Sequence, residues 1–251
     1  MIDETELYRQ DHPHRCLEYI QHFFEQAQYP YVQAVYVMGS VVTGDYHLGY
    51  SDLDIIIFTN AIDLTELMDS LRALNAKLWI VNFHLLKPND VPPPDLLFTA
   101  RLLAESELLF GQDLLSTLNK IPGPALRHQL LLLLSQQIVS LRAFYCSKVL
   151  EKYKPDKIMY DAQKLSLFGL RALLLVLGEK NTQRQHIINY VTATENILTP
   201  MNQQFFFNLL DRFEKQQNPD THDECLLVLQ QTISLLEEVQ AYIFKYHLGN
   251  S

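Results

Sequence analysis

The chain has 251 residues, of which 48% are hydrophobic and 20% charged. This length and composition are typical of one large or two smaller globular domains with a substantial hydrophobic core. The formal net charge of −9 argues against a non-specific nucleic-acid binder, which needs a basic surface. The same charge is compatible with a cationic substrate, although solubility alone also explains it.

Cysteine usage and the apolar runs indicate where the protein works. The three cysteines, Cys16, Cys146 and Cys225, are far apart without CxxC spacing, so we expect neither a disulfide framework nor a zinc site. The first 15 residues are polar and acidic, unlike a signal peptide. The longest leucine run, residues 130–134, is too short to span a bilayer and predicts a core helix. We therefore expect a cytoplasmic protein that does not associate with membranes.

Helices and strands alternate in the first half of the chain. Helical spacing of apolar residues predicts some segments, and β-rich runs predict the others. The segment 52–59 is almost continuously apolar, which is typical of a strand buried on both faces. The predicted order is helix 15–28, strand 34–38, strand 52–59, helix 63–74, strand 77–86, and helix 95–110 with Gly111 as its C-terminal glycine.

The pattern changes after the Pro- and Gly-containing segment 121–124, beyond which every predicted element is a helix. These helices cover roughly residues 126–141, 159–177, 183–193, 200–216 and 223–247. The sequence therefore predicts an α+β protein of two domains. Residues 1–121 would form a catalytic domain with a small mixed β-sheet, and residues 122–251 an all-α helical bundle that binds substrate.

The most informative stretch, VMGSVVTGDYHLGYSDLDIII, spans residues 37–57. Side chains alternate along a strand, so Asp52 and Asp54 point the same way and repel each other unless a cation lies between them. Mg²⁺ suits such a pair, because one or two carboxylates and substrate phosphates commonly hold it. Gly39 allows close backbone approach to a phosphate, and Ser40 adds a hydroxyl donor. A carboxylate pair or a Gly-Ser pair alone is common on surface loops, but their combination predicts a site for Mg²⁺ and a nucleoside triphosphate.

This stretch resembles the signature of the nucleotidyltransferase (polymerase-β-like) superfamily: an apolar strand, Gly-Ser, a spacer of about ten residues, then Asp-x-Asp opening a second apolar strand. Within it, the chain looks most like the aminoglycoside adenylyltransferases of the streptomycin/spectinomycin type. The layout of an N-terminal catalytic domain and a helical C-terminal domain agrees, and ARLLAESELLFGQDL (residues 100–114) resembles the segment that follows their catalytic sheet. The resemblance covers most of the chain.

The resemblance implies roles for individual residues. Gly39, Ser40 and Ser51 would bind the nucleotide, and Asp52 and Asp54 would bind Mg²⁺. A hydroxyl of a small cationic acceptor, an aminoglycoside or aminocyclitol, would attack the α-phosphate of ATP and release pyrophosphate. The resemblance leaves open whether the chain is a monomer or a homodimer.

The family pattern also has a third acidic residue on the third strand, where this chain has Asn82 and His84 instead. His84 would be the general base, since imidazole is partly neutral near pH 7, and Asn82 would position a ligand. A hydrogen-bonded histidine at a strand end is the alternative for His84, and Asp90 or Asp95 from the following loop is an alternative acid. The departure also leaves open a regulatory, nucleotide-binding pseudoenzyme.

In the helical domain, residues 157–191 resemble the family segment that contacts both substrates. By that match Asp161 would face the amines of the acceptor and Arg184 the triphosphate, although both also fit a solvated helix face. AMP transfer to a protein or RNA acceptor, as in toxin–antitoxin systems, is a further alternative. The low basic content argues against RNA.

Overall fold

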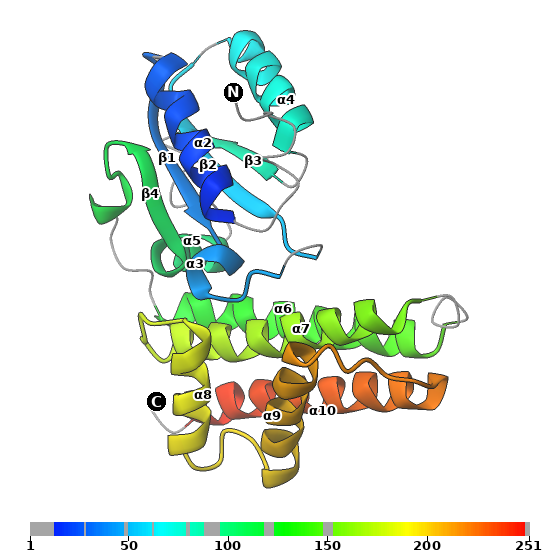
Figure 1. The fold of residues 1–251 in the computed structure, drawn as a ribbon. Coiled ribbons are helices and arrows are strands. Elements are labelled where there is room, and N and C mark those ends of the chain that lie inside the picture. Colours follow the sequence, from blue (N-terminus) through cyan, green and yellow to red (C-terminus); the bar gives the residue numbers. More distant parts are fainter. Residues whose placement is uncertain are drawn as a thin grey trace. The chain divides into compact units, whose positions relative to one another are not determined.

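The computed structural model describes residues 13–27, 29–47, 50–61, 63–78, 81–87, 96–117, 123–147 and 153–248. The chain divides into two compact units, Met1–Ile121 and Pro122–Ser251, which are described separately (Figure 1). The first contains a sheet and helices, and the described part of the second contains helices only. The predicted α+β class is confirmed.

A mixed four-stranded sheet in the order β3-β2-β1-β4 forms the centre of the first unit. Strand β2 pairs antiparallel with β1 and parallel with β3, while β4 pairs antiparallel with the other edge of β1. The end of β1 and the starts of the other three strands therefore lie at the same end of the sheet. The strands span Val32–Met38 (β1), Leu53–Thr59 (β2), Val81–Leu86 (β3) and Ser106–Gly111 (β4).

Helices cover both faces of this sheet because the side chains of β1 and β2 are apolar on both sides. On one face, Ile55 and Ile57 pack in a core cluster with residues of α2 and α4. On the opposite face, Ile56 and Phe58 pack with Leu102 of α5. The buried character predicted for segment 52–59 is thus confirmed. The helices span Pro13–Ala27 (α2), Ser40–Thr43 (α3), Thr65–Leu78 (α4) and Leu96–Ala104 (α5).

The helix predicted for residues 95–110 is wrong in its second half. Helix α5 ends at Ala104, and the next residues form strand β4, which pairs with β1. Six apolar-rich residues carry too little periodicity to separate a strand from a helix, whereas the backbone groups along the second edge of β1 require a partner. Gly111 has φ of +86° as a helix-ending glycine would, but it ends a strand, where a β-carbon would lie 2.1 Å from the Gln33 carbonyl oxygen.

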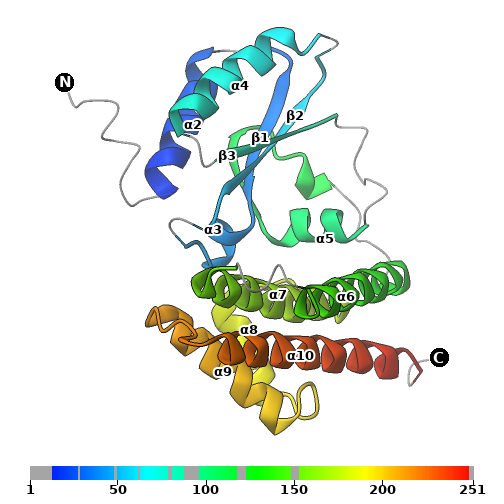
Figure 2. The same ribbon diagram turned by 90° about the vertical axis from the view of Figure 1, so that its right-hand side faces the viewer.

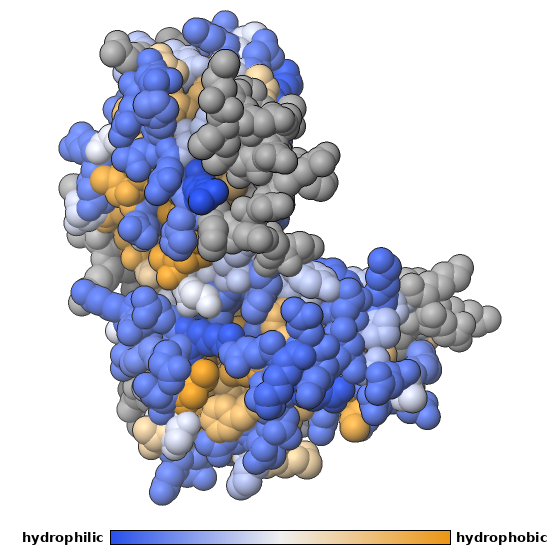
Figure 3. Space-filling model, viewed as in Figure 1, coloured by the Kyte–Doolittle hydropathy of each residue, from blue (hydrophilic) through white to orange (hydrophobic). Residues whose placement is uncertain are grey.

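Five helices make up the described part of the second unit, and α10 packs along α6 and α7 (Figure 2). No helix in the described ranges has the length and apolar character needed to cross a membrane. The surface in Figure 3 is mostly hydrophilic in both units, with small hydrophobic patches. The helices span Gly123–Tyr145 (α6), Pro155–Val176 (α7), Arg184–Ala193 (α8), Pro200–Glu214 (α9) and His222–Leu248 (α10).

Two leucines on α6 test the packing of the helical unit. Leu130 is fully buried, whereas Leu132 is 53% exposed. We expect Leu130→Ala to lower the free energy of unfolding by about 2–5 kcal/mol through lost burial and a residual cavity. Leu132→Ala is the matched control and should stay within about 0.5 kcal/mol of wild type. Urea denaturation followed by circular dichroism measures both, and equal effects would contradict the assigned packing of α6.

Candidate active site

Most of the predicted site residues lie at one end of the sheet in the first unit. The antiparallel register pairs Met38 with Asp54, and the parallel register pairs Asp54 with Asn82. The end of β1 therefore pairs with the start of β2, which in turn pairs with the start of β3, at the place where the carboxylates lie. The residues gathered there are Gly39, Ser40, Ser51, Asp52, Asp54, Asn82 and His84.

Strand alternation directs the polar side chains of this end to one face. Asp54 is two residues before Ile56, which packs on the α5 side of the sheet. His84 pairs with Ile56 in the parallel register, so it lies on the same face. In the described part of the first unit, α5 and Leu115 pack on that face, whereas α2 and α4 pack on the other. The side chains of Asp54 and His84 on this face remain partly exposed, at 38% and 46%.

Gly39 connects β1 to α3 with a φ of +87°, a conformation that side-chain-bearing residues rarely adopt. A β-carbon at this position would lie 3.5 Å from Asp54 Oδ2, so a longer side chain would occupy the space in front of the carboxylate. The carbonyl of Ser40 accepts the backbone N–H of Asp45 at 2.8 Å and closes the following turn. Buried Ser51 accepts the backbone N–H of His47 through Oγ at 3.0 Å, so it stabilises the loop before the carboxylates.

The Asn82 amide lies between the two carboxylates. Its Nδ2 donates a hydrogen bond to Asp52 Oδ2 and makes a longer contact of 3.5 Å with Asp54 Oδ1. One amide nitrogen thus offers its two hydrogens to two negative charges, which lowers their mutual repulsion. The amide nitrogen lies in the position between the carboxylates where a cation would be expected.

His84 contacts the second carboxylate, with Nε2 3.3 Å from Asp54 Oδ1. This hydrogen bond raises the pKa of His84 above its usual value. Partial burial opposes the rise, and the charges of Asp54 and Asp52 add to it. Burial pushes the pKa of Asp54 upward, but hydrogen bonds from His84 and Asn82 and the charges of His84 and Arg101 hold it below the usual range. Without a metal, the pair therefore favours a protonated imidazole beside an ionised carboxylate.

Two residues of this region were missed by the sequence interpretation. Arg101 on α5 donates from Nε to Oε2 of Glu105 at 2.9 Å, and Glu105 is only 1% exposed. The Glu105 carbonyl accepts the N–H of Gly39 at 3.0 Å. Burial raises the pKa of Glu105, and the neighbouring Arg101 charge lowers it only in part. The Arg-x3-Glu spacing on a predicted helix was the available signal, since residues four apart share a helix face.

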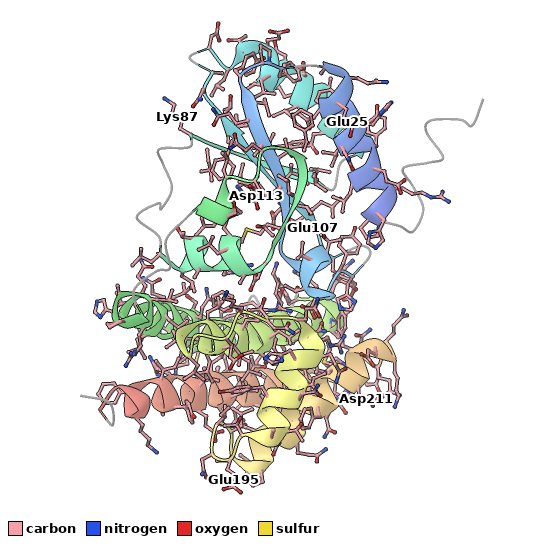
Figure 4. The ribbon with its side chains drawn as sticks, turned by 90° about the vertical axis from the view of Figure 1, so that its left-hand side faces the viewer. Glu25, Lys87, Glu107, Asp113, Glu195 and Asp211 are labelled. Atoms are coloured by element: carbon pink, nitrogen blue, oxygen red, sulfur yellow. The ribbon has the colours of Figure 1, made fainter. Side chains whose placement is uncertain are left out.

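Helix α5 and strand β4 follow each other directly, with only Glu105 between them. Figure 4 labels Glu107 on β4 and Asp113 beyond the strand. Asp113 accepts the Tyr36 hydroxyl at 2.9 Å. This contact ties the segment after β4 to β1. Both ends of β4 are therefore attached to β1 or to its loop, since the residue before β4 binds Gly39.

The donor set fits Mg²⁺ in its two-carboxylate mode of binding. Asp52 and Asp54 are hard oxygen ligands, and Gly39 leaves space in front of Asp54 for substrate phosphates. Among the described ranges, no group of three or more His, Cys, Asp and Glu side chains is arranged to hold a metal. The alternative acids Asp90 and Asp95 lie outside the described residues.

The two site residues predicted in the second unit each have an ionic partner within that unit. Asp161 on α7 contacts Lys157 Nζ at 2.8 Å and accepts the Tyr153 hydroxyl at 3.1 Å. Arg184 begins α8 and contacts Glu214 Oε1 through Nη2 at 2.7 Å. Both side chains therefore already have an opposite charge beside them.

Comparison with known proteins agrees with this geometry. A family model described as a nucleotidyltransferase domain matches residues 17–90. Among solved structures, the chain matches that of spectinomycin adenyltransferase from Enterococcus faecialis with ATP and spectinomycin. The match has a TM-score of 0.57 and 11% identity and covers 90% of this chain and 100% of that chain, so it shows a shared fold. No curated protein matches the chain by sequence.

The contact between His84 and Asp54 predicts a titration. In metal-free protein, the pKa of His84 should lie above 6.5, and Asp54→Asn should lower it because the variant removes the hydrogen-bonding carboxylate and its charge. NMR of the imidazole resonances across pH 5–9 measures this. Asp69→Asn is the matched control, since Asp69 is an exposed carboxylate on α4 that pairs with Arg72. An unchanged His84 titration in Asp54→Asn would contradict the assigned contact.

Proposed function

Since this chain matches a nucleotidyltransferase domain on an adenylyltransferase-like fold, we propose that it transfers AMP from Mg-ATP to a hydroxyl of a small cationic acceptor. The acceptor class that we propose is an aminoglycoside or aminocyclitol. The observation that carries the proposal is the pair Asp52 and Asp54, held at one end of the sheet in front of Gly39. The net charge of −9 and the three free cysteines suit a cationic acceptor and a reducing cytoplasm.

Asp52 and Asp54 would hold Mg²⁺, which supplies charge neutralisation at the reacting phosphates when bound. Gly39 and Ser40 would contact the triphosphate through backbone and hydroxyl donors, and Ser51 would keep the carboxylate loop in place. The acceptor oxygen forms a bond to the α-phosphorus, the bond from this phosphorus to the oxygen of the β-phosphate breaks, and pyrophosphate leaves. The hydroxyl proton must go to a base.

His84 is the base in this proposal. Its neutral form accepts the hydroxyl proton, and the adjacent Asp54 carboxylate stabilises the imidazolium that results. Asn82 positions the two carboxylates through its amide. In the second unit, Asp161 would exchange Lys157 for an acceptor amine, and Arg184 would exchange Glu214 for the triphosphate.

One observation favours a second candidate, a regulatory nucleotide-binding protein without catalysis. Asn82 stands where the family pattern has an acidic residue, and its amide bridges the carboxylates that would hold the metal. A site with two carboxylates still suits Mg-ATP binding. The two candidates therefore differ in turnover and agree in nucleotide binding.

A pyrophosphate assay tests the proposal. With ATP, Mg²⁺ and a panel of aminoglycosides and aminocyclitols, we expect acceptor-dependent release of pyrophosphate. Asp54→Asn should lower the rate at least about 100-fold because it removes a charge that holds the metal. His84→Gln should lower kcat about 100-fold or more with little change in ATP affinity.

The control in this assay is Asp69→Asn, which removes an exposed carboxylate on α4 and should keep the wild-type rate. ATP binding without pyrophosphate release for any acceptor would favour the regulatory candidate. A wild-type rate in His84→Gln would remove that residue from the mechanism.

The isosteric variant Asn82→Asp tests the role of the amide. It replaces a hydrogen-bond donor by a third negative charge, so the metal-free protein should melt at a lower temperature. Added Mg²⁺ should then raise the melting temperature of the variant more than that of wild type, because the third carboxylate strengthens metal binding. Differential scanning calorimetry with and without Mg²⁺ measures both. An equal response of the two proteins would contradict the position assigned to Asn82.

A further inference from the structure

We infer that Arg101 is a phosphate-binding residue of the proposed site and that Glu105 is the residue that positions it. The inference rests on the proposed function, because it assigns to α5 a part in holding the triphosphate. It is carried by three contacts: the ion pair of Arg101 with Glu105, the packing of α5 on the site face, and the bond between Glu105 and Gly39.

The first observation is the burial of Glu105. Only 1% of it is exposed, and its Oε2 accepts Arg101 Nε, while Oε1 has no hydrogen-bond partner in the described part of the chain. Burying a carboxylate is costly, and an apolar residue of similar size often serves stability as well or better. Glu105 therefore holds a particular cation, Arg101, in a particular place.

The second observation is where Arg101 lies. It neighbours Leu102, which is fully buried in the cluster with Met38 and Ile56. Asp54 lies on the same face of the sheet. About a third of the Arg101 side chain remains exposed, which leaves it accessible to a ligand.

The third observation connects this ion pair to Gly39, where the triphosphate would bind in the proposed function. The residue that holds Arg101 also accepts the Gly39 N–H through its backbone carbonyl. Gly39 and Arg101 both contact Glu105, the residue between α5 and β4. A shift of Glu105 would move both of them.

The chemistry of the site indicates which ligand Arg101 would bind. Helix α5 packs on the face of the sheet that carries Asp54, and Arg101 gives this helix a permanently charged guanidinium. A guanidinium offers a planar fork of donors that matches two oxygens of a phosphate. A triphosphate beside two negatively charged carboxylates would gain charge neutralisation from the Arg101 guanidinium.

Binding measurements with a double-mutant cycle test the inference. The probes are Mg-ATP and magnesium tripolyphosphate, measured by calorimetry on the full chain. We expect Arg101→Gln to weaken both by the same factor, about 10-fold to 100-fold, as for the loss of a charge-assisted hydrogen bond. Glu105→Gln should weaken both by less and should have no further effect in the Arg101→Gln background, because Glu105 acts through Arg101. Arg72→Gln on α4 removes an exposed arginine and should match wild type.

The outcomes separate the inference from the proposed function. If wild type binds Mg-ATP, Asp54→Asn loses it, and folded Arg101→Gln binds both probes as wild type does, the inference is overturned and the proposed function stands. If wild type does not bind Mg-ATP, both are overturned. Melting temperatures without ligand check folding. Should Arg101→Gln unfold, Arg101→Lys keeps the ion pair but loses the fork, so it should bind both probes several-fold more weakly. Wild-type binding in Arg101→Lys would then overturn the inference.

Discussion

The repulsion between two carboxylates at the start of β2 is the constraint on which the site depends. Asp52 directly precedes β2 and Asp54 is its second residue, and the Asn82 amide contacts both. Their charges therefore lie close together, and the rest of the site compensates them. The amide of Asn82 donates to both, and His84 contacts the second. Hydrogen bonds from Asn82 and His84 thus offset the negative charge that a bound cation would neutralise in the proposed reaction.

The junction between α5 and β4 connects this constraint to the fold. Strand β4 pairs with the second edge of β1, so its first residue, Ser106, lies beside the end of β1, whose other edge pairs with the start of β2. Glu105 therefore reaches the Gly39 N–H with its carbonyl and Arg101 with its carboxylate. One residue before a strand thus serves backbone pairing and charge placement together.

The regular elements and the loop motif could be predicted because they depend on local patterns. The apolar run of β2 and the helical spacing in α6 and α7 each carry enough residues to show their period. Strand β4 could not be predicted in this way, since six residues beside a helix carry no separate signal. Its conformation follows from the free edge of β1, which is 68 or more residues earlier in the chain, as the pairing of Met38 with Ser106 shows.

The sequence by itself determined that two carboxylates would share a face behind a Gly-Ser turn, and that a helical unit would follow an α/β unit, because strand alternation and helical periodicity are local properties. Only the tertiary structure decided which side chains compensate those carboxylates. Asn82 and His84 lie 28 and 30 residues from Asp54 and meet it through the register of β2 and β3. Arg101 and Glu105 reach the same end of the sheet because β4 pairs with β1. Such contacts depend on strand pairing between distant segments, which no local pattern specifies.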